Sequence, residues 1–285
     1  MFSSRIIRAS IVPEHIPDGP DRIENARRVL AHDGAVVVGG LHAESDAIGF
    51  ATELLGDRLV RVGRQFRADM TTSRREAGLV DAQPVDSRGR KRSFGSPEER
   101  MTAHNDGFAF GDHAPDHLFL WCSRPAMPSG GDSFLIDAAA LVDLLRDEPR
   151  VPGLADFCWN TAIDHSEPNF PLPDPAPIAR RTPSGRVQVR FHPYLASCPG
   201  APPGHETMIG VWRAAVDHVR DNGPMFRAEA GEMLCIDNFR VLHGRDGYTD
   251  PDRAMSSIWA WTTDALAVPR EALDIVAPDL AALHR

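Results

Sequence analysis

The sequence is short of positive charge and contains almost no lysine. Its 31 basic residues include a single lysine, Lys91, and 40 acidic residues outnumber them, which gives a net charge of −9 at pH 7. General nucleic-acid binders and proteins that dock onto anionic membranes both rely on an excess of positive charge. We therefore expect neither a nucleic acid nor a membrane as a partner, and the oligomeric state stays open.

Cysteine is also scarce, and long hydrophobic runs are missing. Cys122, Cys158, Cys198 and Cys235 are far apart in the sequence, so they form no zinc-binding or redox motif. We expect free thiols in a reducing compartment. The N-terminal residues contain no apolar segment long enough for a signal peptide or a membrane span. These absences predict a cytoplasmic location.

The overall composition is typical of a globular protein. The 285 residues are 42% hydrophobic and 25% charged, and they show no internal repeat or low-complexity boundary. A chain of this length can bury a sizeable core. We expect a single domain over residues 1–285.

Apolar spacing and turn residues predict a mainly β fold with flanking helices. The chain opens as helix, strand and helix over residues 20–32, 35–38 and 43–55. Many short strands separated by turns then predict an antiparallel sandwich or barrel, with helices against one face. Strands are expected at 104–110, 118–122, 133–136, 178–181, 186–191, 231–236 and 254–261, and helices at 138–145 and 205–219.

Residues 61–102 break this pattern. They are polar and contain a basic run at residues 88–92. One interpretation is a solvated loop. The other is a lid that brings positive charge over the site of an anionic substrate, because long loops in compact domains often have a function.

The residues best suited to chemistry are His104 and Asp106. On a strand, alternate side chains share a face, so these two residues point the same way while Asn105 points away. Together with a distant histidine, His243, they match the 2-His-1-carboxylate triad, which binds Fe(II) and leaves three positions open. Alone, the His-x-Asp pattern is a weak signal, because it also fits a hydrogen-bonded surface pair.

An arginine begins the last expected strand. Arg253 shares a face of that strand with Met255, Ser257, Trp259 and Trp261, and we expect the two tryptophans to pack in the core. A buried guanidinium needs an anion, and its planar fork matches a carboxylate. The alternative is a surface ion pair between Arg253 and a neighbouring aspartate.

Four motifs together resemble a known enzyme family. They are His104-Asn105-Asp106, Gly130-Gly131-Asp132-Ser133, the segment 237–245 and Arg253. Their order and spacing are similar to those of the Fe(II)/2-oxoglutarate dioxygenases of the taurine dioxygenase and γ-butyrobetaine hydroxylase group. The resemblance is close at the motifs and extends in outline over residues 20–265.

The resemblance implies a double-stranded β-helix, or jelly roll, with a cupin-like core. His104, Asp106 and His243 would bind Fe(II). Arg253 would pair with the distal carboxylate of the co-substrate 2-oxoglutarate, and Ser133 would add a hydrogen bond. With O2 as the other co-substrate, the implied reaction oxidises an unactivated C–H bond of a small molecule and releases succinate and CO2.

The chain departs from the family pattern at some positions. Asn105 stands where many relatives have threonine, and we assign it no role. Taurine-type members carry a sulfonate-binding arginine where this chain has Ser257, so a sulfonate substrate is not expected. Asp106 is present, whereas related halogenases have a small residue there, so halogenation is not expected. Because loop lengths vary in this region, Arg245 is the alternative anchor to Arg253.

The sequence offers few candidate substrate contacts. Phe108 and Asp112 follow the first ligands, Arg190 and His192 share a strand face, and Ser257 replaces the sulfonate-binding arginine. Each of these residues also has an ordinary structural interpretation. The habits of the family suggest a small polar metabolite, either amino-acid-like or a natural-product intermediate. Hydroxylation is the simplest outcome, with desaturation, epoxidation and ring formation as alternatives.

Two other classes of protein stay open. A hydrolase or isomerase can use a different divalent metal on the same three ligands, and a jelly-roll protein can bind a ligand without catalysis. Neither class needs Arg253 together with Ser133, so these two residues discriminate between the hypotheses.

Overall fold

The computed structural model describes residues 2–64, 97–166 and 174–269. The basic run at residues 88–92 and most of the predicted loop at 61–102 lie outside these ranges.

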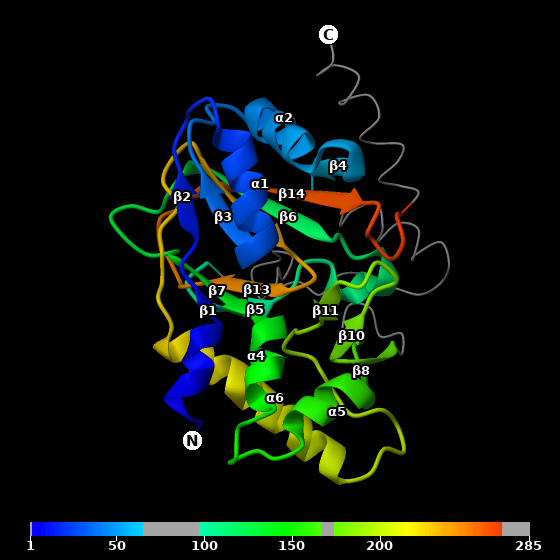
Figure 1. The fold of residues 1–285 in the computed structure, drawn as a ribbon. Helices are drawn as coiled ribbons and strands as arrows, with labels where there is room; N and C mark the ends of the chain where they lie inside the picture. Colours follow the sequence, from blue (N-terminus) through cyan, green and yellow to red (C-terminus); the bar gives the residue numbers. More distant parts are fainter. Residues whose placement is uncertain (1, 65–96, 167–173, 270–285) are drawn as a thin grey trace, which may run out of the picture.

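Two β-sheets form the centre of the molecule (Figure 1). The six-stranded sheet has the order β2 (Glu14–Ile16), β3 (Ala35–Val38), β12 (Glu232–Asp237), β6 (His117–Arg124), β14 (Ala254–Thr262) and β4 (Leu59–Arg64). The four-stranded sheet has the order β1 (Ser10–Ile11), β7 (Ser133–Asp137), β13 (Val241–Arg245) and β5 (Met101–His104). Neighbouring strands are antiparallel except β2 and β3. This arrangement is the double-stranded β-helix expected from the sequence.

Helices cover the two sheets at opposite ends of the molecule. In Figure 1, α1 (Arg22–Asp33) and α2 (Glu44–Leu55) lie over the six-stranded sheet. At the other end are α4 (Ala138–Leu145), α5 (Leu154–Asn160) and α6 (Gly204–Asn222), of which α4 and α6 contact the four-stranded sheet. Each end has its own hydrophobic cluster of buried side chains. Within the described ranges, no helix is both long and apolar enough to cross a membrane.

Short elements complete the chain. The 3-10 helices are η1 (Ser4–Ala9), η2 (Gly56–Arg58) and η3 (Phe108–His113). Two small antiparallel ribbons pair β8 (Ala162–Asp164) with β9 (Pro175–Pro177), and β10 (Ala179–Arg181) with β11 (Val187–Val189). The second ribbon confirms the predicted strands at 178–181 and 186–191 and shows that they pair.

Most of the predicted elements are confirmed, and two predictions are wrong. The opening helix, strand and helix are confirmed, as are α4, α6 and the strands β6, β7, β12 and β14. The predicted strand at 104–110 ends at His104, and η3 follows it. The predicted loop at 61–102 begins too early, because β4 continues to Arg64 and pairs with β14. Residues 149–177, which show little pattern in the sequence, contain α5, β8 and β9.

Close packing of β5, β7 and β13 requires a glycine beside His243. Gly244 lies in the middle of β13, and a Cβ atom there would stand 2.6 Å from the Met101 carbonyl oxygen of β5. It would also collide with the ring of Phe134, which is buried in β7. Any side chain at position 244 must therefore push the strands apart.

We expect Gly244→Ala to lower the free energy of unfolding by about 1–3 kcal/mol, because overpacking a tight core strains the backbone. Chemical unfolding followed by tryptophan fluorescence measures the change. Gly210→Ala is the matched control, since nothing lies within 4 Å of a Cβ atom at this position of α6. Alanine favours a helix, so the control should be slightly more stable than the wild type. Equal stability of Gly244→Ala and wild type would contradict this account.

Candidate metal centre

His104 and Asp106, which are two residues apart in the sequence, meet the distant His243 between the two sheets. One possible ligand atom from each of His104, Asp106 and His243 lies within 4.8 Å of the other two. Asp106 Oδ1 is 3.4 Å from His104 Nε2 and 3.6 Å from His243 Nε2. The two histidines are directly opposite each other in the β5–β13 ladder, and their ring centroids are 4.3 Å apart.

A hydrogen bond at Nδ1, the ring nitrogen that does not face Asp106, fixes the orientation of the His104 ring. Its Nδ1 lies 2.9 Å from the Thr102 carbonyl oxygen, which accepts a hydrogen bond from an Nδ1–H group. This contact selects the tautomer whose Nε2 carries the lone pair, and Nε2 is the atom that faces Asp106. His243 Nδ1 is buried without a hydrogen-bond partner among the residues that the structure describes.

The two oxygens of the Asp106 carboxylate face different groups. Oδ2 accepts a hydrogen bond of 2.7 Å from Trp259 Nε1 and lies 3.4 Å from Ser257 Oγ, both in β14. Oδ1 faces the two imidazoles. The sequence analysis placed Trp259 in the core, where it is fully buried, but missed its hydrogen bond. The sequence did indicate that Ser257 and Trp259 share a strand face with Arg253, which is the pattern from which a contact with the site could have been inferred.

The charge states of the three groups suit a divalent cation. Burial alone would raise the pKa of Asp106, but the adjacent imidazoles of His104 and His243 hold this pKa well below its usual range. Burial, with a contribution from His104, lowers the pKa of His243 to about 3. At neutral pH the cluster therefore offers one carboxylate and a neutral imidazole from His243, and two imidazoles with one carboxylate are a typical set for Fe(II).

Asp106 reaches this point by a turn and not by strand alternation. Strand β5 ends at His104, and Gly107 has a φ of +72°. A Cβ atom at Gly107 would lie 2.6 Å from Pro115 Cδ, so this turn needs glycine. The side chain of Asp106 faces His104 because the chain turns here, and the predicted shared strand face does not exist.

Arg253 and Ser133 line one small cavity near the cluster. Ser133 pairs with Arg245, which is two residues along β13 from His243. The Arg253 guanidinium lies over the Tyr248 ring, with its carbon 4.6 Å from the ring centroid.

The neighbouring acidic residues do not neutralise Arg253. Asp252 pairs with Arg124 at 3.2 Å, and Asp250 accepts hydrogen bonds from the main chain of Met127 and Asp252. The surface ion pair considered as the alternative is therefore not formed. A guanidinium beside a serine in a cavity fits the distal carboxylate of a dicarboxylic acid.

The guanidinium of Arg245, the alternative anchor, is hydrogen-bonded to main-chain carbonyl groups. Its Nη1 donates to the carbonyl oxygens of Pro97, Glu99 and Asp246 at 3.0–3.2 Å. Its guanidinium also lies 4.8 Å from the centroid of the Tyr248 ring. These contacts tie down the segment before β5, which is a structural role.

Three of the candidate substrate contacts lie together. The rings of Phe108 and His192 are stacked, with centroids 4.4 Å apart and planes 10° from parallel. Arg190 Nη2 donates to the Phe108 carbonyl oxygen at 2.9 Å and to Asp174 Oδ2 at 2.6 Å. The Phe191 main chain between Arg190 and His192 is hydrogen-bonded to Asn105, so this group adjoins the metal ligands.

A second buried histidine, missed in the sequence, belongs to the same group. His165 and His192 are fully buried, and their ring centroids are 5.5 Å apart. Both nitrogens of His165 and the Nε2 of His192 lack a hydrogen-bond partner among the described residues. Burial, with Arg190 and Arg213, lowers the pKa of His192 to about 3. Burial and Arg190 lower that of His165 well below its usual value.

The other two candidate substrate contacts lie apart from this group. Asp112 pairs with Arg180 at 2.6 Å, and its side chain is 60% exposed. Ser257 lies beside Asp106, as described above.

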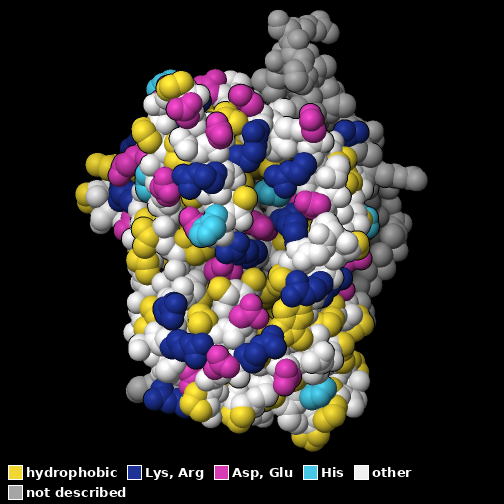
Figure 2. All heavy atoms as spheres, viewed as in Figure 1, with side chains coloured by type: hydrophobic (Ala, Val, Ile, Leu, Met, Phe, Trp, Pro, Cys, Tyr) yellow, Lys and Arg dark blue, Asp and Glu magenta, His cyan; other side chains and the backbone are white. Residues whose placement is uncertain are grey.

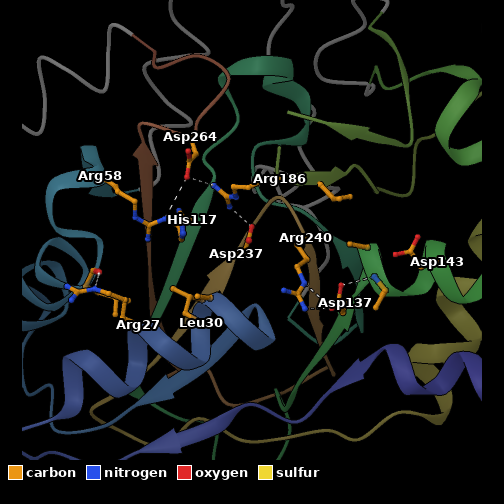
Figure 3. Close-up of a pocket in the computed structure, with 15 residues that line it drawn as sticks. Arg27, Leu30, Arg58, His117, Asp137, Asp143, Arg186, Asp237, Arg240 and Asp264 are labelled. Carbon is orange, nitrogen blue, oxygen red and sulfur yellow. Dashed lines mark hydrogen bonds and ion pairs between the residues drawn. The ribbon is translucent and has the colours of Figure 1, made fainter. Parts of the chain in front are cut away.

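A cavity of about 570 Å³ lies elsewhere, between the N-terminal helices and the ends of β12 and β7 (Figure 3). Its walls carry ion pairs: Arg186 with Asp237 at 2.7 Å, and Arg240 with Asp137 at 2.6 Å. None of the three clustered ligands lines it. The size of a cavity therefore does not identify the reactive site.

Figure 2 shows basic and acidic side chains interspersed over the face of the molecule that it displays.

Comparison with known proteins assigns the family. The family described as "Taurine catabolism dioxygenase TauD, TfdA family" matches residues 10–259, and the chain belongs to it. The protein is thus a non-haem iron dioxygenase that uses 2-oxoglutarate and O2. This assignment favours an oxygenase over the hydrolase, isomerase and silent binding alternatives.

Solved structures with the same fold include several oxygenases. An asparagine oxygenase in complex with Fe(II), 2S,3S-3-hydroxyasparagine and succinate is 21% identical, with a TM-score of 0.53 over 85% of this chain and 78% of that chain. The non-haem iron oxygenase OrfP, with Fe and α-ketoglutaric acid, is 16% identical, with a TM-score of 0.52 over 91% and 84%. A putative α-ketoglutarate-dependent taurine dioxygenase from Burkholderia xenovorans is 16% identical, with a TM-score of 0.56 over 91% and 90%.

We expect Trp259→Phe to weaken divalent-metal binding by about tenfold or more, since removing a partner of a metal ligand typically costs 10–100-fold in affinity. The substitution removes the indole N–H that orients Asp106 and keeps an aromatic ring. Mn(II) binding followed by electron paramagnetic resonance measures the change.

Trp261→Phe is the control for this substitution, because its Nε1 bonds the His113 carbonyl oxygen at 3.0 Å and not Asp106. Equal Mn(II) affinities for Trp259→Phe and Trp261→Phe would show that the indole N–H does not support the ligand.

The buried histidines predict a loss of stability in mild acid. The folded-state pKa of His192 is about 3, below the value of about 6.5 in the unfolded chain, so only the unfolded chain gains this proton as the pH falls from about 6.5. The free energy of unfolding should drop by about 1.4 kcal/mol per pH unit for this group. His192→Gln should have a slope shallower by that amount in unfolding measured between about pH 4 and pH 5.5, where this histidine is protonated almost fully in the unfolded chain and hardly at all in the folded one. His32→Gln, at an exposed position, should keep the wild-type slope.

Proposed function

We propose that the protein hydroxylates an unactivated C–H bond of a small, amino-acid-like polar metabolite, with release of succinate and CO2. Residues 1–285 act as one catalytic domain in this proposal. The observation that carries it is the cluster of His104, Asp106 and His243, together with Arg253 and Ser133, which line one small cavity.

The three clustered side chains hold the iron. Iron bound with 2-oxoglutarate and O2 supplies the oxidising chemistry, which the side chains of this protein lack. His104 and Asp106 are pre-oriented by Thr102 and Trp259, so the ligands need little rearrangement when the metal binds. Two imidazoles and one carboxylate would leave coordination positions of the iron open for co-substrates.

Arg253 and Ser133 hold the distal carboxylate of 2-oxoglutarate. Arg253 has the fork geometry for a carboxylate, and the acids beside it in sequence are engaged elsewhere. Ser133 contributes a hydroxyl from the first position of β7. Ser133 lies opposite Arg245, two residues along β13 from His243, which supports an anchor close to the proposed metal ligands.

The polar head of the substrate binds at Phe108, His192 and Arg190. His165 lies next to the ring of His192. Neutral buried imidazoles with unused nitrogens favour a ligand that offers hydrogen-bond donors and acceptors. A zwitterionic amino acid or an amide has both. The solved structures of the asparagine oxygenase and of OrfP contain hydroxyasparagine and hydroxy-arginine, which supports the same class of substrate. Ser257 offers no cation for a sulfonate.

Anaerobic addition of Fe(II) and then 2-oxoglutarate should produce a weak visible charge-transfer band, and His243→Ala should abolish it. Arg253→Ala should raise the 2-oxoglutarate concentration for half-maximal absorbance by about 30-fold or more. Loss of one partner of a buried charge pair costs about 2 kcal/mol or more, and Fe(II) binding should not change.

Arg245→Ala is the counterpart variant. If it weakens 2-oxoglutarate binding while Arg253→Ala does not, the anchor is Arg245. If the wild type binds Fe(II) but gives no band with 2-oxoglutarate, the proposed co-substrate site is wrong.

A further inference from the structure

The ladder of β5 stops at His104, so another contact must hold the main chain of Asp106. The side chain of Asn238 provides it. Asn238 Oδ1 accepts a hydrogen bond from the Asp106 N–H at 2.9 Å, and Asn238 Nδ2 donates to the Asp106 carbonyl oxygen at 2.9 Å. The second Nδ2 hydrogen bonds the Pro115 carbonyl oxygen at 2.7 Å. One side-chain amide thus bonds both the N–H and the carbonyl group of Asp106.

A second asparagine holds Asn238 in turn. Asn105 Nδ2 donates to the Asn238 carbonyl oxygen at 2.8 Å. Asn105 Oδ1 accepts from the Phe191 N–H at 2.9 Å, and the Asn105 N–H donates to the Phe191 carbonyl oxygen at 3.2 Å. Asn105, to which the sequence analysis gave no role, therefore links the ligand turn to the segment that carries His192.

Both asparagines are shielded from water. Asn238 is 2% exposed and Asn105 is 5% exposed, and every donor and acceptor of the Asn238 amide is engaged. A saturated buried amide network is rigid, because any displacement leaves a polar group unpaired in a dry environment.

We infer that Asn238, supported by Asn105, is a positioning residue that sets the place of the metal-binding carboxylate. Trp259 orients the Asp106 carboxylate, and Asn238 fixes the backbone from which this carboxylate extends. The inference rests on the proposed role of His104, Asp106 and His243 as metal ligands.

The residue type follows from the chemistry of the contact. The site needs one acceptor for an N–H group and two donors for carbonyl oxygens, and a primary amide on a short stem supplies this set. Aspartate has the same size but no donor, so it would place a negative charge against two carbonyl oxygens and near Asp106. Asn238→Asp is therefore the sharpest test, because it changes only the hydrogen-bonding pattern and the charge.

Mn(II), which does not turn over, serves as the probe of the full-length protein. Titration calorimetry and the electron paramagnetic resonance spectrum of bound Mn(II) should show a 10–100-fold weaker Kd and a changed spectrum for Asn238→Asp. Asn222→Asp is the matched control, since this exposed asparagine at the end of α6 bonds only His218. Its Mn(II) Kd should equal that of the wild type.

The outcomes separate a positioning role from a purely structural one. A lower Tm with an unchanged Mn(II) Kd and spectrum in folded Asn238→Asp would overturn the inference. Should this variant fail to fold, Asn238→Ser replaces it, because a hydroxyl fits the site and keeps one hydrogen bond. A wild-type Mn(II) Kd in folded Asn238→Ser would equally overturn the inference.

Asp106→Ala separates the inference from the proposed function. If Asp106→Ala loses Mn(II) while Asn238→Asp keeps wild-type affinity, the ligand assignment stands and the role of Asn238 is wrong. If Asp106→Ala binds Mn(II) as the wild type does, the proposed metal site itself is wrong.

Discussion

The carboxylate of Asp106 contacts side chains from both sheets, so its position depends on how the two sheets are held together. One oxygen faces His104 and His243 of the four-stranded sheet, and the other accepts the indole N–H of Trp259 from the six-stranded sheet. Both contacts form only if the sheets are held at one separation. The hydrophobic clusters at the two ends of the molecule provide this rigidity, since close-packed cores resist small displacements. Core packing thus acts on the metal centre although few core residues touch it.

Away from this centre, buried charges are neutralised locally. Asp116 is fully buried, and it accepts hydrogen bonds from the main chain and hydroxyl of Thr262 and from Arg186, with His117 Nδ1 at 3.0 Å. Burial alone would raise the pKa of Asp116, but His117, Thr262 and Arg186 hold it well below its usual range. Such a network adds little net stability, but it fixes the relative positions of β6, β14 and the start of β11. The walls of the cavity in Figure 3 likewise carry paired basic and acidic side chains.

The sequence predicted the side chains of the metal centre better than the path that brings them together. Periodicity and turn residues found most strands and helices, because these patterns reflect burial that each element imposes on its own residues. The turn at Asp106 depends on Gly107 and on Asn238, which is 132 residues away, and no local pattern contains that contact. Trp259 was correctly expected to be buried, but burial does not reveal the partner of an indole N–H. Long-range polar contacts of this kind require the fold to be known first.

The same distinction explains why the family alone does not give the substrate. The proposed metal ligands lie on β5, β13 and the turn between β5 and η3, next to the strands of the jelly roll. The proposed substrate contacts lie on η3, on the segment after β11 and next to β8, outside the two large sheets. Elements outside the sheets can change without loss of the metal centre. Ser257 illustrates the point: where taurine-type members carry an arginine, this chain has a hydroxyl beside Asp106, and the cation at the substrate side is instead Arg190, already paired with Asp174. Because that pair leaves little free positive charge for a sulfonate, the proposed recognition rests on the buried imidazoles of His165 and His192.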